Sequence, residues 1–116
     1  MTSTQNVLNH HTKALRDGDL DAVLADYALN AVFFTNQGAF KGLDAIKPVF
    51  AAIISEFRKP ETKVNRTRQL IDGDYAYILW TAETADNVYE MATDTFVVRD
   101  GKIVAQSFTA KVTPKS

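Results

Sequence analysis

The sequence contains no cysteine, which excludes a disulfide framework and any metal site built from thiolates. It also lacks a long apolar run, since nothing in it approaches the roughly 20 consecutive apolar residues that a membrane-spanning helix needs. The first residues show no basic segment followed by an apolar stretch, which is the pattern of an export signal. We therefore expect a cytoplasmic protein with no membrane partner.

An excess of charge of one sign is also missing. The 13 Lys and Arg residues are balanced by 14 Asp and Glu residues, and the formal net charge is -1. A protein that binds nucleic acid neutralises runs of phosphates with clustered Lys and Arg, and no basic stretch of that kind is present. We therefore expect no nucleic-acid partner.

With 116 residues, of which 46% are hydrophobic, the chain has the size and the apolar content of one domain over residues 1–116. In its first half the apolar residues recur at the spacing of amphipathic helices. The expected helices cover about residues 4–16, 19–27 and 42–57, and a short strand covers 31–35. Pro48 should bend the third helix near its start or cost it one backbone hydrogen bond.

From about Glu61 onward the apolar residues alternate instead, which is typical of strands. Turn signals at Asp72–Asp74, Asp86–Asn87 and Asp100–Gly101 divide this half into four antiparallel strands. Helices first and strands afterwards predict an α+β domain. In this domain three N-terminal helices pack on the concave face of a curved antiparallel β-sheet.

Four short motifs follow one another along nearly the whole chain. They are the turn Asp17–Asp21, the aromatic-alanine pair Tyr27–Ala28, the helix opening Gly42–Ile46 and the hairpin Asp94–Ile103. Their order and spacing resemble the nuclear transport factor 2-like superfamily, which includes ketosteroid isomerases and SnoaL-type polyketide cyclases. The resemblance implies a cone-shaped fold whose curved sheet and helices enclose an apolar pocket.

The resemblance also points to functional positions. Ketosteroid isomerases carry a hydrogen-bond-donating tyrosine on the first helix, a general-base aspartate at the end of the first strand, and a second aspartate that acts as a protonated donor. These positions correspond to His11, Thr35 and Asp94 in this sequence. One of the three groups is therefore retained, one is replaced by another polar group, and the base is missing.

Asp94 is the first candidate for an acid/base role. A two-residue turn at Asp86–Asn87 would pair Leu79 with Asp94 and Thr81 with Ala92, which places Asp94 on a largely apolar face. Desolvation there should raise the pKa of Asp94 unless a cation or several donors face it. The alternatives are a buried acid whose hydrogen bonds are satisfied, or an acid that faces a dimer partner.

His11 is the second candidate, because it lies on the buried stripe of the first helix while His10 points about 100° away toward solvent. Proximity to Asp94 would make an acid/base pair. The alternative is a hydrogen-bonded core histidine. Two adjacent histidines on a helix cannot face one metal ion, and no carboxylate cluster accompanies them, so no metal site is expected.

Two functions are consistent with these residues. The first is a cofactor-independent isomerase, cyclase or lyase that moves a proton on a small hydrophobic carbonyl compound, with Asp94 and His11 as the catalytic residues. The second is a non-catalytic module of the same fold that binds a hydrophobic ligand or another protein. No nucleotide-binding glycine motif is present, and we expect no cofactor. The expected ligand-binding residues are Tyr27, Phe34, Thr35, Phe50, Leu79, Thr81, Phe96, Gln106 and Phe108.

The other face of the expected sheet predicts self-association. It would carry Ile78, Trp80, Tyr89, Met91 and Val97, which water solvates poorly. We therefore expect a homodimer through this outer face, which is also a common arrangement in the superfamily.

Glu83 and Glu90 would face each other near the hairpin tip as a pair of carboxylates. Because a hairpin tip is usually solvated, we expect these carboxylates to be hydrated by water or neutralised by Arg66 or Arg68 on the preceding strand. They are not predicted to be catalytic.

Overall fold

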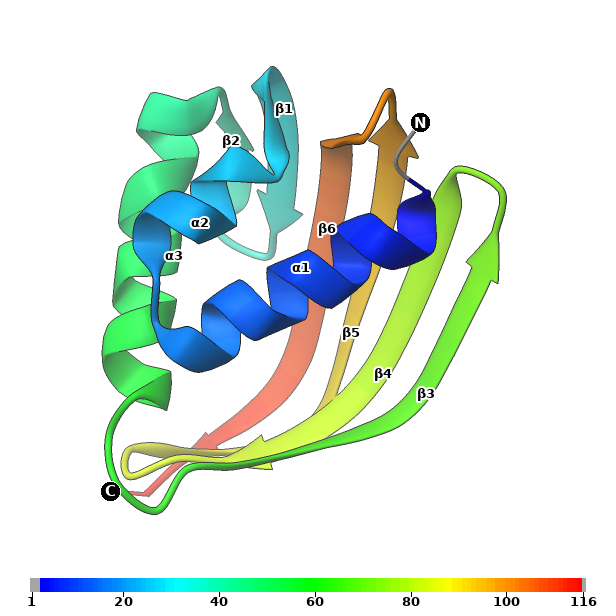
Figure 1. Cartoon of the computed structure of the whole chain (residues 1–116). Helices are drawn as coiled ribbons and strands as arrows, with labels where there is room; N and C mark the ends of the chain where they lie inside the picture. The colour runs from blue at the N-terminus through cyan, green and yellow to red at the C-terminus, as the bar shows by residue number, and fades with distance from the viewer. Residues whose placement is uncertain (1–2, 116) are drawn as a thin grey trace.

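Three helices lie against the concave face of one curved sheet in the computed structural model, which describes residues 3–115 (Figure 1). The limits of the expected domain, residues 1 and 116, lie outside the described residues. The elements are α1 (Thr4–Asp17), α2 (Leu20–Ala25), β1 (Tyr27–Thr35), β2 (Gly38–Lys41), α3 (Leu43–Phe57), β3 (Lys63–Asp72), β4 (Tyr75–Glu83), β5 (Asn87–Arg99) and β6 (Lys102–Pro114). The α+β prediction is confirmed.

The sheet has the strand order β2-β1-β6-β5-β4-β3. Strands β3 to β6 form the antiparallel meander that the sequence predicts. The sheet is nevertheless mixed, because β1 pairs with β6 in parallel, with Phe33 opposite Gln106. The expectation of a wholly antiparallel sheet was therefore wrong. The short strand β2, which was not expected, covers the free edge of β1.

The pairing of β4 with β5 differs from the expected register. The loop is longer than two residues, since Thr84 N donates to Asn87 O and Glu83 pairs with Val88. The longer loop alone would move the register of β4 against β5 by two residues, which leaves every side chain on its expected face of the sheet. An irregularity between Trp80 and Ala82 then moves the register back by one residue, so the net difference from the expected pairing is one residue. A net shift of one exchanges the two faces of a strand.

As a result, Asp94 pairs with Ile78 and not with Leu79. Ile78 and Trp80 therefore share the concave face with Asp94, whereas Leu79 and Thr81 lie on the outer face. The expected assignment of the β4 side chains was wrong for this reason.

The helix ends follow from local side chains. The Ser3 side chain accepts from Asn6 N at the start of α1, and Gly18 ends that helix with a φ of 69°. Asp19 caps α2 as predicted, by accepting from Ala22 N. The helix stops at Ala25, so the expectation that it runs through Tyr27 was wrong.

The hydrophobic core fills the space between the helices and the sheet at the end where β1 and α2 lie. Its largest fully buried apolar side chains are Phe33, Phe96, Leu8, Ile46, Ile103 and Val23. Pro48 lies inside α3, which continues through it. Among the described residues no helix combines the length and the apolar content needed to cross a membrane.

Candidate functional site

A cavity of about 1030 Å³ opens between the concave face of the sheet and the C-terminal parts of α1 and α3. This volume is at the upper end of the roughly 300–1000 Å³ common for small-molecule sites. Its aromatic lining comprises Phe33, Phe50, Phe57, Trp80, Tyr89, Phe96 and Phe108. His11, Asp94 and Gln106 are the polar groups among these rings, so the cavity is apolar with a few convergent polar atoms.

Asp94 accepts two hydrogen bonds inside this cavity. Trp80 Nε1 donates to Oδ2 at 2.9 Å, and Gln106 Nε2 donates to Oδ1 at 3.2 Å. Burial raises the pKa of Asp94, while the two hydrogen bonds act in the opposite direction, as does His11 when it carries a positive charge. Burial is the larger effect, so the pKa lies above its ordinary value, in the direction that the sequence predicts.

Tyr27 extends this hydrogen-bond chain behind the cavity wall. Its hydroxyl donates to Gln106 Oε1, which orients the Gln106 amide so that its NH₂ group faces Asp94. Burial raises the pKa of Tyr27 well above its ordinary value, and the negative charges of Asp94 and Asp26 add to this effect. Tyr27 therefore remains a donor, although it is not among the residues that line the cavity.

His11 is only 2% exposed and is enclosed by aromatic rings. The rings of Tyr27, Phe50 and Phe96 meet it edge-on, with centroids 5.6, 5.9 and 5.6 Å away. Its Nδ1 lies 3.7 Å from Oδ2 of Asp26, and neither atom has a hydrogen-bond partner within residues 3–115. The expected burial of His11 is confirmed.

Asp26 was not selected from the sequence. The sequence pattern predicts a helix that runs through Tyr27, which gives Asp26 no special position. In the structure the chain turns at Asp26, and the turn directs this carboxylate back toward α1. Its other oxygen, Oδ1, lies 2.7 Å from Nδ1 of His10. His10 is exposed on its other side, as expected. An acidic residue immediately after a short helix is the signal that would have suggested this turn.

Several expected ligand-binding residues lie elsewhere. Phe34 is 50% exposed, and its neighbour Phe33 lines the cavity instead. Thr35 accepts from Gln37 N in the turn between β1 and β2. Neither Leu79 nor Thr81 lines the cavity. The expected residues that do line it are His11, Phe50, Asp94, Phe96, Gln106 and Phe108.

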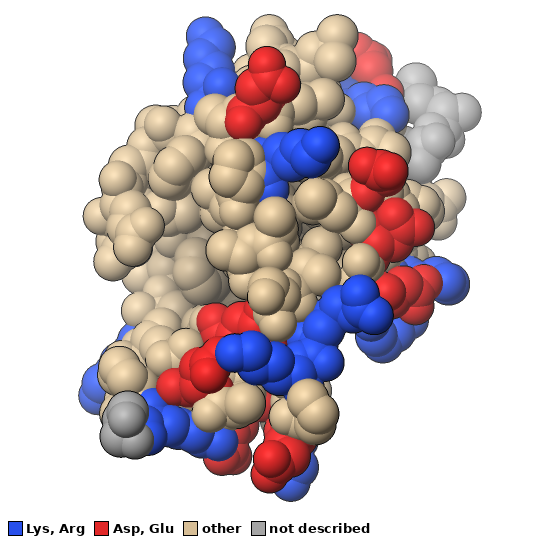
Figure 2. All heavy atoms as spheres, turned by 90° about the vertical axis from the view of Figure 1, so that its left-hand side faces the viewer, with Lys and Arg blue, Asp and Glu red and all other residues tan. Residues whose placement is uncertain are grey.

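The cavity mouth is charged, with both signs present. Its charged residues are Arg16, Asp17, Arg58, Lys59, Glu61 and Arg66. Asp17 is bound by Lys13 at 2.7 Å, and Lys59 by Asp86 at 2.8 Å. Figure 2 shows acidic and basic side chains mixed over the lower half of this side of the molecule. All six charged residues are exposed, so they lie where the cavity meets solvent.

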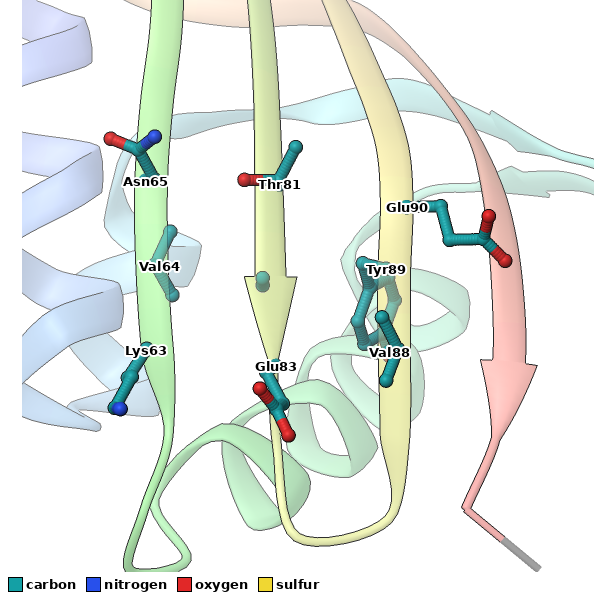
Figure 3. Close-up of a pocket in the computed structure, with 9 residues that line it drawn as sticks. Lys63, Val64, Asn65, Thr81, Glu83, Val88, Tyr89 and Glu90 are labelled. Atoms are coloured by element: carbon teal, nitrogen blue, oxygen red, sulfur yellow. The ribbon is translucent and has the colours of Figure 1, made fainter.

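A second, shallow hollow of about 330 Å³ lies at the ends of β3, β4 and β5 (Figure 3). It contains Glu83 and Glu90, but Glu90 points toward β6 and away from Glu83 (Figure 3). Glu83 forms an ion pair with Lys115 at 2.6 Å, and Glu90 accepts from the Thr113 hydroxyl. These hydrogen bonds lower the pKa of both carboxyls. Glu90 also lies 3.6 Å from Nζ of Lys111, so lysines balance the charge of both carboxylates, and not Arg66 or Arg68.

An unclosed, curved six-stranded sheet with three helices on its concave face and a cavity between them is the architecture of the nuclear transport factor 2-like proteins. The chain belongs to the SnoaL-like domain family, whose model matches residues 8–106. Among curated proteins no sequence matches it.

Solved structures of this architecture superpose on nearly the whole chain. A protein from Kribbella flavida is 17% identical, with a TM-score of 0.81, and the superposition covers 96% of this chain and 88% of that protein's chain. An NTF2-like protein of unknown function from Mesorhizobium loti is 22% identical, with a TM-score of 0.79 and coverages of 93% and 90%. SalBIII, an epoxide hydrolase/cyclase-like enzyme in pyran ring formation in the polyether salinomycin, is 17% identical, with a TM-score of 0.78 and coverages of 92% and 89%. At these identities the likeness shows the fold alone.

Proposed function

We propose that residues 1–116 form one SnoaL-like domain that acts as a cofactor-independent acid/base enzyme on a small hydrophobic carbonyl compound. One observation carries this proposal: a half-buried carboxyl with a raised pKa, Asp94, and a buried histidine, His11, line the same apolar cavity. Perturbed titratable groups in an apolar cavity are typical of acid/base catalysis.

The two groups suit the two halves of a proton transfer. His11 accepts a proton from the carbon next to the ligand carbonyl, and the electrons of the broken C–H bond move onto the carbonyl oxygen to form an enolate. Protonated Asp94 donates a hydrogen bond to that oxygen, where the negative charge develops. Return of the proton from His11 to a second carbon completes an isomerisation. Attack of the enolate carbon on an electrophile in the same molecule gives a cyclisation instead.

The cavity walls support an apolar substrate. Phe33 stacks on Phe50 with centroids 5.3 Å apart, and Trp80 stacks on Phe108 at 6.1 Å. Such walls exclude water, which strengthens the electrostatic effect of the few polar groups inside. SalBIII, which shares the fold, is described as a cyclase-like enzyme, and this description favours chemistry over simple binding.

Exchange of ketone protons with D₂O, followed by NMR on a panel of small cyclic ketones and enones, tests the proposal. We expect the protein to accelerate exchange for at least one ligand that binds. His11→Gln and Asp94→Asn should each lower the rate by about 10²-fold or more, whereas exposed Lys41→Ala should have no effect. Phe108→Ala should weaken ligand affinity by about tenfold through lost apolar contact. Ligands that bind without any accelerated exchange would refute the enzyme.

A second candidate is a non-catalytic module that binds a hydrophobic ligand. Two observations favour it: Trp80 and Gln106 already occupy both oxygens of Asp94, and Thr35 lies in a turn at the position of the general base in ketosteroid isomerases. For such a module, Phe108→Ala weakens binding while Asp94→Asn and His11→Gln change no rate.

We also propose that the protein is a cytoplasmic homodimer formed through the outer face of the sheet. Ile78, Trp80 and Tyr89, which were expected on that face, line the cavity instead. The support now comes from other apolar side chains on the outer face. Leu70 is 48% exposed and Tyr75 is 56% exposed, and the register places Tyr77 beside Leu70.

A further inference from the structure

Asp26, at the junction of α2 and β1, carries a buried carboxylate that the proposed proton transfer does not use. Among the described residues its Oδ2 has no hydrogen-bond partner, and the same holds for Nδ1 of His11. These two atoms lie 3.7 Å apart. Buried polar atoms without partners are rare in folded proteins, so two of them side by side need an explanation.

The backbone fixes the position of Asp26. Its carbonyl oxygen accepts from Ile103 N at 2.8 Å, and its N–H donates to Val23 O at 3.2 Å. Its Oδ1 is occupied by Nδ1 of His10 at 2.7 Å. The carboxylate is therefore anchored at one oxygen, and the other oxygen faces His11.

This arrangement selects one tautomer of His11. Neutral imidazole carries a proton on only one of its two nitrogens. If Nδ1 lacked the proton, its lone pair would face the lone pairs of Oδ2, which is repulsive. With the proton on Nδ1, a buried donor faces a buried acceptor, and an approach of about 0.5 Å completes the hydrogen bond.

We propose that Asp26 is a positioning residue that holds His11 in the Nδ1–H tautomer and so leaves Nε2 free to accept a proton in the cavity. When His11 is protonated, the negative charge of Asp26 stabilises the imidazolium. The catalytic meaning of this pair rests on the proposed function. The tautomer itself is a property of the resting protein and is measurable without a substrate.

The other titratable groups near His11 or Asp26 do not replace Asp26 in this role. These groups are His10 on α1, Tyr27 on β1, Asp94 on β5 and Lys102 on β6. His10 binds the far oxygen of the carboxylate, and Tyr27 donates to Gln106. Asp94 is occupied by Trp80 and Gln106, and Lys102 binds the backbone oxygen of Ala25. None of these four groups presents an unpartnered buried atom to Nδ1 of His11, whereas Asp26 does.

Long-range ¹H–¹⁵N NMR of the histidine rings reports which nitrogen carries the proton. The wild type and His10→Gln are compared first, because His10→Gln assigns the His11 signals and retains Asp26. We expect the Nδ1–H tautomer for His11 in both proteins. In Asp26→Asn and Asp26→Ala we expect the Nδ1–H population of His11 to fall.

An Nε2–H tautomer for His11 in the wild type would overturn the proposal, and this measurement decides even where a variant does not fold. An unchanged His11 spectrum in folded Asp26→Ala would also overturn it. With a ketone that undergoes exchange, Asp26→Asn should lower kcat on the order of 10²-fold and change KM little. An Nδ1–H tautomer without any exchange refutes the proposed function and leaves the pair intact.

Discussion

Trp80 donates its indole N–H to Oδ2 of Asp94 at 2.9 Å, from β4 to β5. The register makes them diagonal neighbours on the concave face, because Asp94 pairs with Ile78 and Trp80 with Ala92. The indole ring forms part of the cavity wall, and its N–H favours the ionised form of a carboxyl that burial pushes toward the neutral form. Trp80 therefore tunes the charge inside the cavity.

Trp80→Phe keeps an aromatic wall but removes this donor. The pKa of Asp94 should then rise further, because one of the two hydrogen bonds that lower it is lost. The unpaired oxygen should cost roughly 1–3 kcal/mol of stability. Carboxyl ¹³C NMR titration measures the first effect and urea denaturation the second. Tyr77→Phe, which removes a hydroxyl on the outer face, is the control and should change neither. An unmoved Asp94 titration in Trp80→Phe would show that the indole does not act on this carboxyl.

The pH dependence of Asp94→Asn tests the raised pKa in a second way. The folded protein holds the Asp94 proton at a pH where the unfolded chain, with a carboxyl pKa near 3.8, has lost it. The folded state therefore binds more protons in that window, and stability from Asp94 falls as pH rises from the unfolded pKa through the folded pKa. Asn cannot ionise and escapes this loss.

The Asn side chain also fits the local hydrogen bonds. The oxygen of this new side chain can accept from Trp80, as Asp94 does in the wild type. If the Gln106 amide flips, its oxygen can accept from the NH₂ group of the new side chain, and its own NH₂ group can donate to the Tyr27 hydroxyl, which accepts as well as donates. The free energy of unfolding of Asp94→Asn minus that of the wild type should accordingly be larger at pH 7 than at pH 4, which means that the variant gains relative stability as pH rises. The same difference at both pH values, in urea denaturation, would contradict a raised pKa.

Most of the fold was predictable because its signals are local. The apolar stripe around His11, the Asp19 cap and the alternation after Glu61 correctly indicated the helices and the four-stranded meander. The parallel pairing of β1 with β6 was not predictable, because Phe33 and Gln106 are neighbours only through tertiary structure. Nothing in residues 89–92 of β5, which hold the extra residue, predicts the shift in register that changes which side chains of β4 share a face with Asp94.

The candidate site was predictable where it depended on helix faces and motif positions, which placed His11, Asp94 and Gln106 in the cavity. It was not predictable where it depended on strand register. Trp80 was assigned to the outer face because a slip of one residue reverses every side chain on a strand. Asp26 was missed because its importance comes from a turn whose geometry brings it beside α1.

The proposed homodimer predicts that Leu70→Glu gives a monomer. Leu70 and its neighbour Tyr77 lie on the outer face, where a buried carboxylate at the interface would be desolvated without a partner. Sedimentation velocity over a range of concentrations measures the change. The control is Leu29→Glu, because Leu29 is 82% exposed and lies on β1, which three strands separate from β3 and Leu70. A wild type that is monomeric at every concentration would contradict the proposed dimer. Equal dissociation of the dimer by both substitutions would show that its interface does not lie on the outer face around Leu70.

Gly18 ends α1 beside the cavity mouth, and Gly18→Ala should destabilise the protein for two separable reasons. A Cβ there would lie 2.4 Å from Cδ of Arg58, and the backbone has a φ of +69°. The left-handed conformation alone should cost about 1–2 kcal/mol. Gly73→Ala isolates that cost, because Gly73 has a φ of +58° and open space around it. We expect Gly18→Ala to be the more destabilising in urea denaturation, and the excess to disappear when both are compared in an Arg58→Ala background. An excess that persists there would mean that contact with Arg58 is not its cause.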